Sequence, residues 1–144
     1  MIHEIPFLGD VFTEKTTIIF VDDDPRCLFV HGSSLYPRFA VKISDDGLEG
    51  LNIHPYDYLI FSQTGWPKSE GELCFIRIGD EVIVRSIYGL FDTEPLLGTV
   101  GDRYPAFRTH RNDFIVQGRL IGRLSPEEVE WIEKQEQSTF CFTG

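Results

Sequence analysis

Short runs in which apolar and polar residues alternate predict a domain built mainly from β-strands. In residues 39–44 every second position is apolar, which is the period of a strand with one buried face. Residues 15–21 and 56–61 are rich in β-branched, aromatic and other apolar side chains and predict two more strands. Residues 113–124 predict a last strand, or two strands with a kink at Gly118. Many short strands with little helix indicate a mostly-β fold.

Residues 72–90 predict a β-hairpin. Gly79 and Asp80 lie between two apolar runs and fit a two-residue turn with glycine first. The alternation continues through residues 81–88, so Arg85 is expected on the same face of its strand as Ile83 and Ile87.

Only residues 126–137 predict a helix. Ser125 as N-cap, Pro126 at the first helical position and Glu128 three residues after the cap form a capping-box signature. The tail that follows is apolar again. It is expected either to pack on the domain's own sheet or to pair at a sheet edge with a second copy or a partner. The candidate interaction residues of this region are Trp131, Phe140 and Phe142.

Composition narrows the function classes. The chain has 144 residues, which fits one domain, and a formal net charge of −10. Such a charge argues against direct nucleic-acid binding, which depends on basic side chains that neutralise phosphates. No secretory signal or membrane-spanning run is visible, and the three cysteines lack a CxxC spacing, so a cytoplasmic protein with reduced thiols is expected. The four histidines show no ligand spacing, and no metal or cofactor is expected.

Four segments together resemble the peptidase domain of the LexA/UmuD self-cleaving family. They are "IPFLG" followed by Val11, "FAVKISDDGLEGLNIHPYDYLIF", "GELCFIRIGDEVIVRSI" and "PLLGTVGDRYPAFRTHRNDFIVQGRLIGRL". The resemblance implies a β fold of short twisted sheets, with one C-terminal helix from the capping pattern. It divides the chain into a linker-like segment (1–14), a peptidase-type domain (15–124) and a C-terminal helix and tail (125–144). Like UmuD, the chain lacks the DNA-binding domain of LexA-like repressors.

The family cleaves its own chain with a serine hydroxyl and a buried neutral lysine that takes the serine's proton. In the matching positions this sequence has Gly47 for the serine and Arg85 for the lysine. Glycine has no nucleophile, and an arginine side chain stays protonated and cannot act as a base. The remaining matches are Ser44 with the family's first serine, Leu48 with its methionine, and Asp57 with the Asp of its Gly-Asp pair, whose glycine is replaced by Tyr56.

The self-cleavage region departs from the family as well. The family cuts an Ala-Gly or similar bond shortly after the "IPxxGxV" segment, whereas Phe12 and Thr13 follow Val11 here. Two roles for Arg85 are open. It could lock the nucleophile loop by pairing with Asp45, Asp46 or Glu49, or it could hold a peptide carboxylate or backbone carbonyl.

The resemblance therefore implies a catalytically inactive peptidase-fold domain that works as a protein-interaction or dimerisation module. Its context would be the DNA-damage (SOS) response or phage-type regulation, with a translesion polymerase or a LexA-type repressor as partner, and a homodimer as its state. Two alternatives remain. The chain could be an active peptidase with a displaced nucleophile, Ser34 of the Ser33-Ser34 pair or Ser44, or it could be a reused scaffold in an unrelated complex.

Overall fold

One mixed β-sheet contains all the strands that the structure describes. The structure, a computed structural model, describes residues 2–13, 16–17, 26–32, 34–99, 105–129 and 131–133. The strands are β1 (Ile2–Val11), β2 (Thr16–Thr17), β3 (Arg26–His31), β4 (Arg38–Ile43), β5 (Tyr58–Ser62), β6 (Glu72–Ile78), β7 (Glu81–Tyr88), β8 (Leu96–Gly98), β9 (Phe107–Arg108), β10 (Ile115–Leu124) and β11 (Trp131–Glu133). Their order in the sheet is β11-β3-β1-β4-β5-β10-β6-β7-β8-β9, and β2 pairs with β7. The expected mostly-β class is confirmed.

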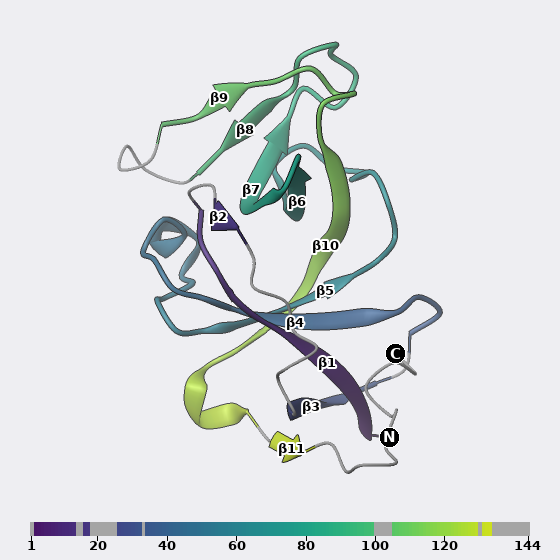
Figure 1. Cartoon of the computed structure of the whole chain (residues 1–144), viewed down its shortest axis with the longest axis vertical. Helices are drawn as coiled ribbons and strands as arrows, with labels where there is room; N and C mark the ends of the chain where they lie inside the picture. The colour runs from purple at the N-terminus through teal and green to yellow at the C-terminus, as the bar shows by residue number, and fades with distance from the viewer. Residues whose placement is uncertain are drawn as a thin grey trace.

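Strand β10 joins two halves of the twisted sheet (Figure 1). Its first residues pair with β6 and its last residues pair with β5. The register shifts between Val116 and Gly118, which confirms the expected irregularity at Gly118. A Cβ at position 118 would lie 2.9 Å from both Phe39 Cζ and Phe61 Cβ, so the close packing of the two aromatic side chains requires glycine there.

Three apolar clusters fill the two faces of the sheet. The first packs against the loop that carries Gly47 and includes Val11, Val41, Ile43, Leu48, Phe61, Phe75, Val82 and Val84. The second, under the β6–β7 hairpin, includes Cys74, Ile76, Ile83, Ile87, Leu97 and Phe114. The third, between β1, β3 and β5, includes Ile5, Phe7, Leu28, Val30, Ala40 and Ile60. Alternate residues of β7 therefore face different clusters, as the sequence pattern requires.

The β6–β7 hairpin forms as predicted. Ile78 pairs with Glu81, so Gly79 and Asp80 make the two-residue turn. Gly79 has a φ of 59°, in the left-handed region that this turn requires and that glycine adopts without steric cost. The hairpin pairing places Arg85 opposite Cys74, in the buried middle of the strands.

The predicted C-terminal helix over 126–137 is wrong. Ser125 and Glu128 do form the capping box, but it closes only one 3-10 turn, η2 (Pro126–Glu128). Val129 then adopts an extended conformation with φ −78° and ψ 129°, and Trp131–Glu133 pairs with β3 as β11. Pairing with an available sheet edge outweighs the helix start signal, because a capping box contributes only about 0.5–2 kcal/mol.

The N-terminal segment 1–14, expected to resemble a linker, contributes a strand to the middle of the sheet. β1 lies between β3, to which it is antiparallel, and β4, to which it is parallel. Of the strand expected over 15–21, Thr16–Thr17 is described as β2. Residues 18–25 and the tail with Phe140 and Phe142 lie outside the described part of the chain.

The two cysteines in the described part differ in state. Cys74 is a free thiol with no exposed surface, and burial, with a smaller contribution from the nearby Glu72 carboxylate, raises its pKa to about 12. Cys27 is disulfide-bonded, so the prediction that the thiols are reduced is wrong at this position. Among the residues that the structure describes, no helix has the length and apolar character to cross a bilayer.

Candidate functional site

The end of β1 and the residues that follow it lie between β4 and β7 and hydrogen-bond to both strands. We call this place the Thr13 cleft, because Thr13 lies in it. On one side, Asp10 and Val11 pair in parallel with Lys42 and Ile43 of β4, and Ser44 N–H donates to the Val11 carbonyl at 2.9 Å. On the other side, Val84 N–H donates to the Phe12 carbonyl at 3.2 Å. Further along, Thr16 pairs with Val82, so the chain passes from β4 to β7 (Figure 1).

Thr13 is anchored in this cleft by the carboxylate of Asp45. The Thr13 N–H donates to Asp45 Oδ2 at 2.8 Å, and the Thr13 hydroxyl lies 3.0 Å from both carboxylate oxygens. The same carboxylate accepts the Gly47 N–H at 3.0 Å. Because the Thr13 side chain is fully buried, Asp45 fixes both the docked segment and the loop that carries Gly47.

Gly47 leaves the space that the Thr13 side chain fills. A Cβ built at position 47 would lie 2.8 Å from Thr13 Cγ2 and 2.9 Å from Thr13 Cβ, and it would come still closer to Thr13 Oγ1. Contacts below 3.0 Å between such atoms are steric clashes. Any other residue at position 47 therefore requires Thr13 to move.

Arg85 binds the carbonyl of the same residue. Its side chain is only 2% exposed, and its Nε donates to the Thr13 carbonyl at 2.8 Å. Its terminal nitrogen Nη1 donates to the carbonyls of Pro105, at 2.8 Å, and Leu97, at 3.3 Å, and the guanidinium stacks 5.2 Å from the centre of the Phe107 ring. Of the two roles considered for Arg85, these contacts fit the binding of a backbone carbonyl. Asp45, one of the candidate partners in the loop-locking role, bonds instead to Thr13 and Gly47.

Gly47 and Arg85 therefore both contact Thr13, Gly47 at its side chain and Arg85 at its carbonyl. The site can hold and polarise the Thr13 carbonyl, since a guanidinium is a strong hydrogen-bond donor. It lacks a hydroxyl at position 47 and a neutral amine at position 85. The two lysines in the described part of the chain lie elsewhere: Lys42 pairs with Asp10 at 3.4 Å and Lys68 is exposed.

The other predicted site residues mostly shape the loop. Leu48 is fully buried in the first cluster, and Glu49 is exposed at the start of the turn η1 (Glu49–Leu51). Asp46 is half-buried in the same loop. Asp57 is buried and accepts from His54 N–H at 2.9 Å and from Arg123 at 3.1 Å. Tyr56 has a φ of 75°, in the left-handed region that non-glycine residues seldom adopt.

The two candidate displaced nucleophiles lie apart from the Thr13 carbonyl. Ser44 is next to the Val11 carbonyl, and its buried hydroxyl has no hydrogen-bond partner. Ser34 accepts the Tyr36 N–H at 3.2 Å in a turn before β4, at the opposite end of that strand from Gly47. Ser33, the other half of the pair, lies outside the described ranges.

Sequence reasoning missed the Thr13–Asp45 anchor. The complementary volumes of threonine at position 13 and glycine at position 47 were the signal for the contact between these two residues. Asp45 was considered only as a partner for Arg85. Among the described residues no group of three or more His, Cys, Asp and Glu could hold a metal ion.

Comparison of the chain with protein-family models and with curated proteins gave no match. The family resemblance therefore rests on the residues quoted above.

Proposed function

We propose that this chain is a catalytically inactive LexA/UmuD-like peptidase-fold domain that acts as a protein-interaction or dimerisation module. One observation carries the proposal. The Thr13 carbonyl is bound by Arg85 Nε at 2.8 Å, while the Thr13 side chain fills the space beside Gly47 from which a hydroxyl would attack. Peptide hydrolysis by this family's chemistry needs a nucleophile and a base at these two positions, and neither residue type can supply one.

The cleft that remains is suited to holding an extended segment. On one side the Val84 N–H donates to the Phe12 carbonyl, and on the other side the Ser44 N–H donates to the carbonyl of Val11, the last residue of β1. This is the geometry of β-strand addition in peptide recognition. Arg85 and Asp45 add charge-assisted hydrogen bonds to the backbone of Thr13. In this structure the segment belongs to the same chain. An equivalent segment of a second copy would fit the same cleft, which supports a homodimer as one form of the module.

The proposed context is DNA-damage or phage-type regulation, with a translesion polymerase or a LexA-type repressor as the protein partner. This context comes from the family resemblance alone, because fold does not determine function. The peptidase alternative has less support, since Ser34 and Ser44 lie beside other backbone groups than the Thr13 carbonyl.

Intact-mass spectrometry of the purified full chain tests the loss of activity. After long incubation at neutral and alkaline pH, we expect a single species of full-length mass. A fragment ending at Thr13 would overturn the proposal. Should a fragment appear, Ser34→Ala and Ser44→Ala variants identify the hydroxyl that produces it.

A rebuilt variant tests the residue matching. Gly47→Ser with Arg85→Lys restores the family's two catalytic residue types, but the serine would clash with Thr13. Thr13→Gly removes all three clashing atoms, so the triple variant is expected to cut after position 13. The matched control carries Gly47→Ala in place of Gly47→Ser and should stay intact. A folded triple variant that stays intact at alkaline pH contradicts the matching.

Affinity capture from source cells, before and after DNA damage, tests the partners. Recovery of a translesion polymerase or of a LexA-type repressor is expected. Recovery of an unrelated complex that is unchanged by damage would contradict the regulatory context and favour the reused-scaffold alternative.

A further inference from the structure

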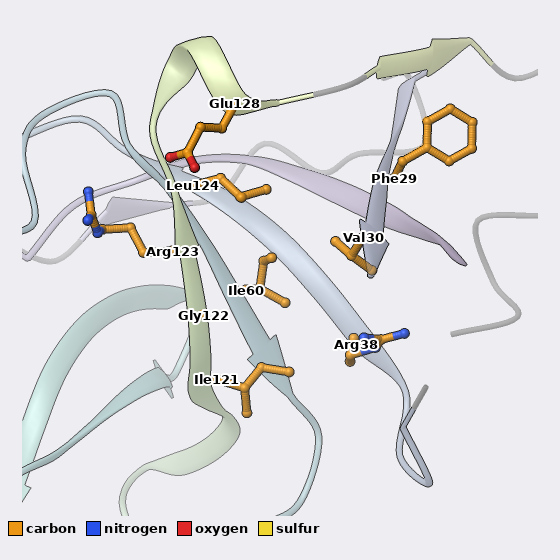
Figure 2. Close-up of a pocket in the computed structure, with 9 residues that line it drawn as sticks. All are labelled: Phe29, Val30, Arg38, Ile60, Ile121, Gly122, Arg123, Leu124 and Glu128. Atoms are coloured by element: carbon orange, nitrogen blue, oxygen red, sulfur yellow. The ribbon is translucent and has the colours of Figure 1, made fainter. Parts of the chain in front are cut away.

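A cavity lies among β3, β4, β5, β10 and η2, and none of its lining residues contacts Thr13. It has a volume of about 280 Å³ and a partly open mouth. Its apolar wall is formed by Val30, Ile60, Ile121 and Leu124. Figure 2 shows Arg38 at one end of the cavity, beside Val30, and Glu128 at the other end. The cavity thus combines an apolar wall with one charged group at each end.

Arg38 carries a buried charge, and none of the residues that the structure describes pairs with it as a counter-ion. The side chain is only 5% exposed, and one terminal nitrogen donates to the Gly32 carbonyl at 3.0 Å. Its Nε is buried and has no hydrogen-bond acceptor. No carboxylate of the described residues pairs with it. Buried charges are normally paired, because an uncompensated one is costly.

The other charged groups around the cavity are already satisfied. Arg123 pairs with Asp57 at 3.1 Å and points away from the cavity centre (Figure 2). Glu128 accepts hydrogen bonds from the Ser125 N–H at 2.9 Å and the Ser125 hydroxyl at 2.8 Å. The unanswered charge of the cavity is therefore the positive one at Arg38, so charge complementarity selects an anion.

We propose that this cavity binds a small monocarboxylate with an apolar body. The carboxylate would sit on the Arg38 guanidinium, whose planar donors match carboxylate geometry. The apolar body would lie against Val30, Ile60 and Leu124, where its burial displaces water. The volume is close to the lower end of ordinary ligand sites, which suits a small molecule better than a folded partner. The site is independent of the Thr13 cleft and of the function proposed for it.

Titration of the isotope-labelled full chain with octanoate, followed by 1H–15N correlation spectra, tests the site. We expect saturable shifts centred on Val30, Ile60 and Gly122. Octanol has the same apolar chain without the charge and should bind at least tenfold more weakly. Equal affinity for octanol and octanoate, or no saturable shift with octanoate, would overturn the proposal.

Two variants and one control variant test whether octanoate binds in this cavity. Arg38→Met keeps an unbranched apolar stem without the charge and should weaken octanoate binding at least tenfold, whereas Arg108→Met, at an exposed arginine on β9, should leave it unchanged. Gly122→Val should block the cavity, because a Cβ at position 122 would lie 3.9 Å from Ile60 Cδ1 without a clash. If Arg38→Met fails to fold, the octanoate affinity of Gly122→Val tests the location of the site by itself. Full octanoate affinity in that folded variant overturns the assignment.

Discussion

Thr13 and Gly47 complement each other in volume, and this pair is the residue-scale basis of the site. The Thr13 side chain fills the space where a Cβ at position 47 would begin, so the two positions should be strongly coupled in stability. Overpacking a buried contact typically costs about 1–3 kcal/mol. Gly47→Ala should therefore lower the free energy of unfolding by about that amount.

The same change should cost much less when Thr13 is replaced by glycine. A double-mutant cycle of Gly47→Ala and Thr13→Gly, measured by urea denaturation, gives the coupling directly. We expect a coupling of about 1–2 kcal/mol. Additive effects of the two changes would mean that Thr13 does not occupy the space beside Gly47.

Cys74, by contrast, is a residue that we expect to be chemically unreactive in the folded protein. Its pKa of about 12 leaves almost no thiolate near neutral pH. We expect iodoacetamide to leave Cys74 unmodified in the native protein and to modify it after unfolding in guanidinium chloride, as followed by mass spectrometry of the peptide that contains it. The raised pKa also makes the free energy of unfolding depend on pH. The free energy of unfolding falls as the pH rises above 9.0, the ordinary pKa of a thiol, because the unfolded thiol ionises first.

At the scale of elements, Glu72 and Arg119 link β6 to β10. The carboxylate and Arg119 Nε are 2.6 Å apart, and the carboxylate also accepts the Lys68 and Ser69 N–H groups. Burial alone would raise the pKa of Glu72, but these hydrogen bonds outweigh the effect of burial and lower the pKa below its ordinary value of 4.5. The stabilisation from this group is therefore present above pH 4.5 and is lost as the pH falls through the lower folded pKa.

This linkage predicts a difference between the wild type and Glu72→Gln. The wild-type free energy of unfolding should fall more steeply below pH 4.5 than that of Glu72→Gln, measured by urea denaturation over a pH series. Glu127→Gln, at an exposed glutamate of η2, is the matched control and should keep the wild-type slope. Parallel curves for the wild type and Glu72→Gln would contradict the role of this link.

The strands and turns also show which parts of the fold could be predicted from the sequence. The β6–β7 hairpin was predictable because its turn and its alternation depend on adjacent residues. The helix over 126–137 was predicted wrongly, since β11 forms through pairing with Leu28 and Cys27, about a hundred positions earlier in the chain. The Gly47 and Arg85 positions were found through the resemblance. Their contact with Thr13 was not, because it depends on how β1 crosses the sheet between β3 and β4.

At the scale of the whole molecule, the place of β1 limits how far the docked segment can open. β1 lies between β3 and β4, and Ile5 and Val11 have no exposed surface. Removing the whole strand would split the sheet and expose two apolar clusters, which amounts to global unfolding. The described residues of the segment that follows Val11 are held by the Val84–Phe12 hydrogen bond, the Thr13 contacts and the β2–β7 pairing. Local opening is therefore confined to the chain after Val11.

Hydrogen exchange can distinguish local opening of the segment after Val11 from removal of the whole strand β1. In the wild type, the amides of Ser44 and Val84 should both be protected, because each donates to the docked chain. In Gly47→Ala, the clash with Thr13 should release the segment after Val11, so Val84 should exchange faster. Ser44 should stay protected, because its acceptor, the Val11 carbonyl, belongs to β1. Joint loss of protection at both amides would mean that β1 leaves with the segment, and the cleft could then be emptied only by unfolding the sheet. Selective loss at Val84 would leave a folded domain whose cleft beside β7 is open to a segment from another chain.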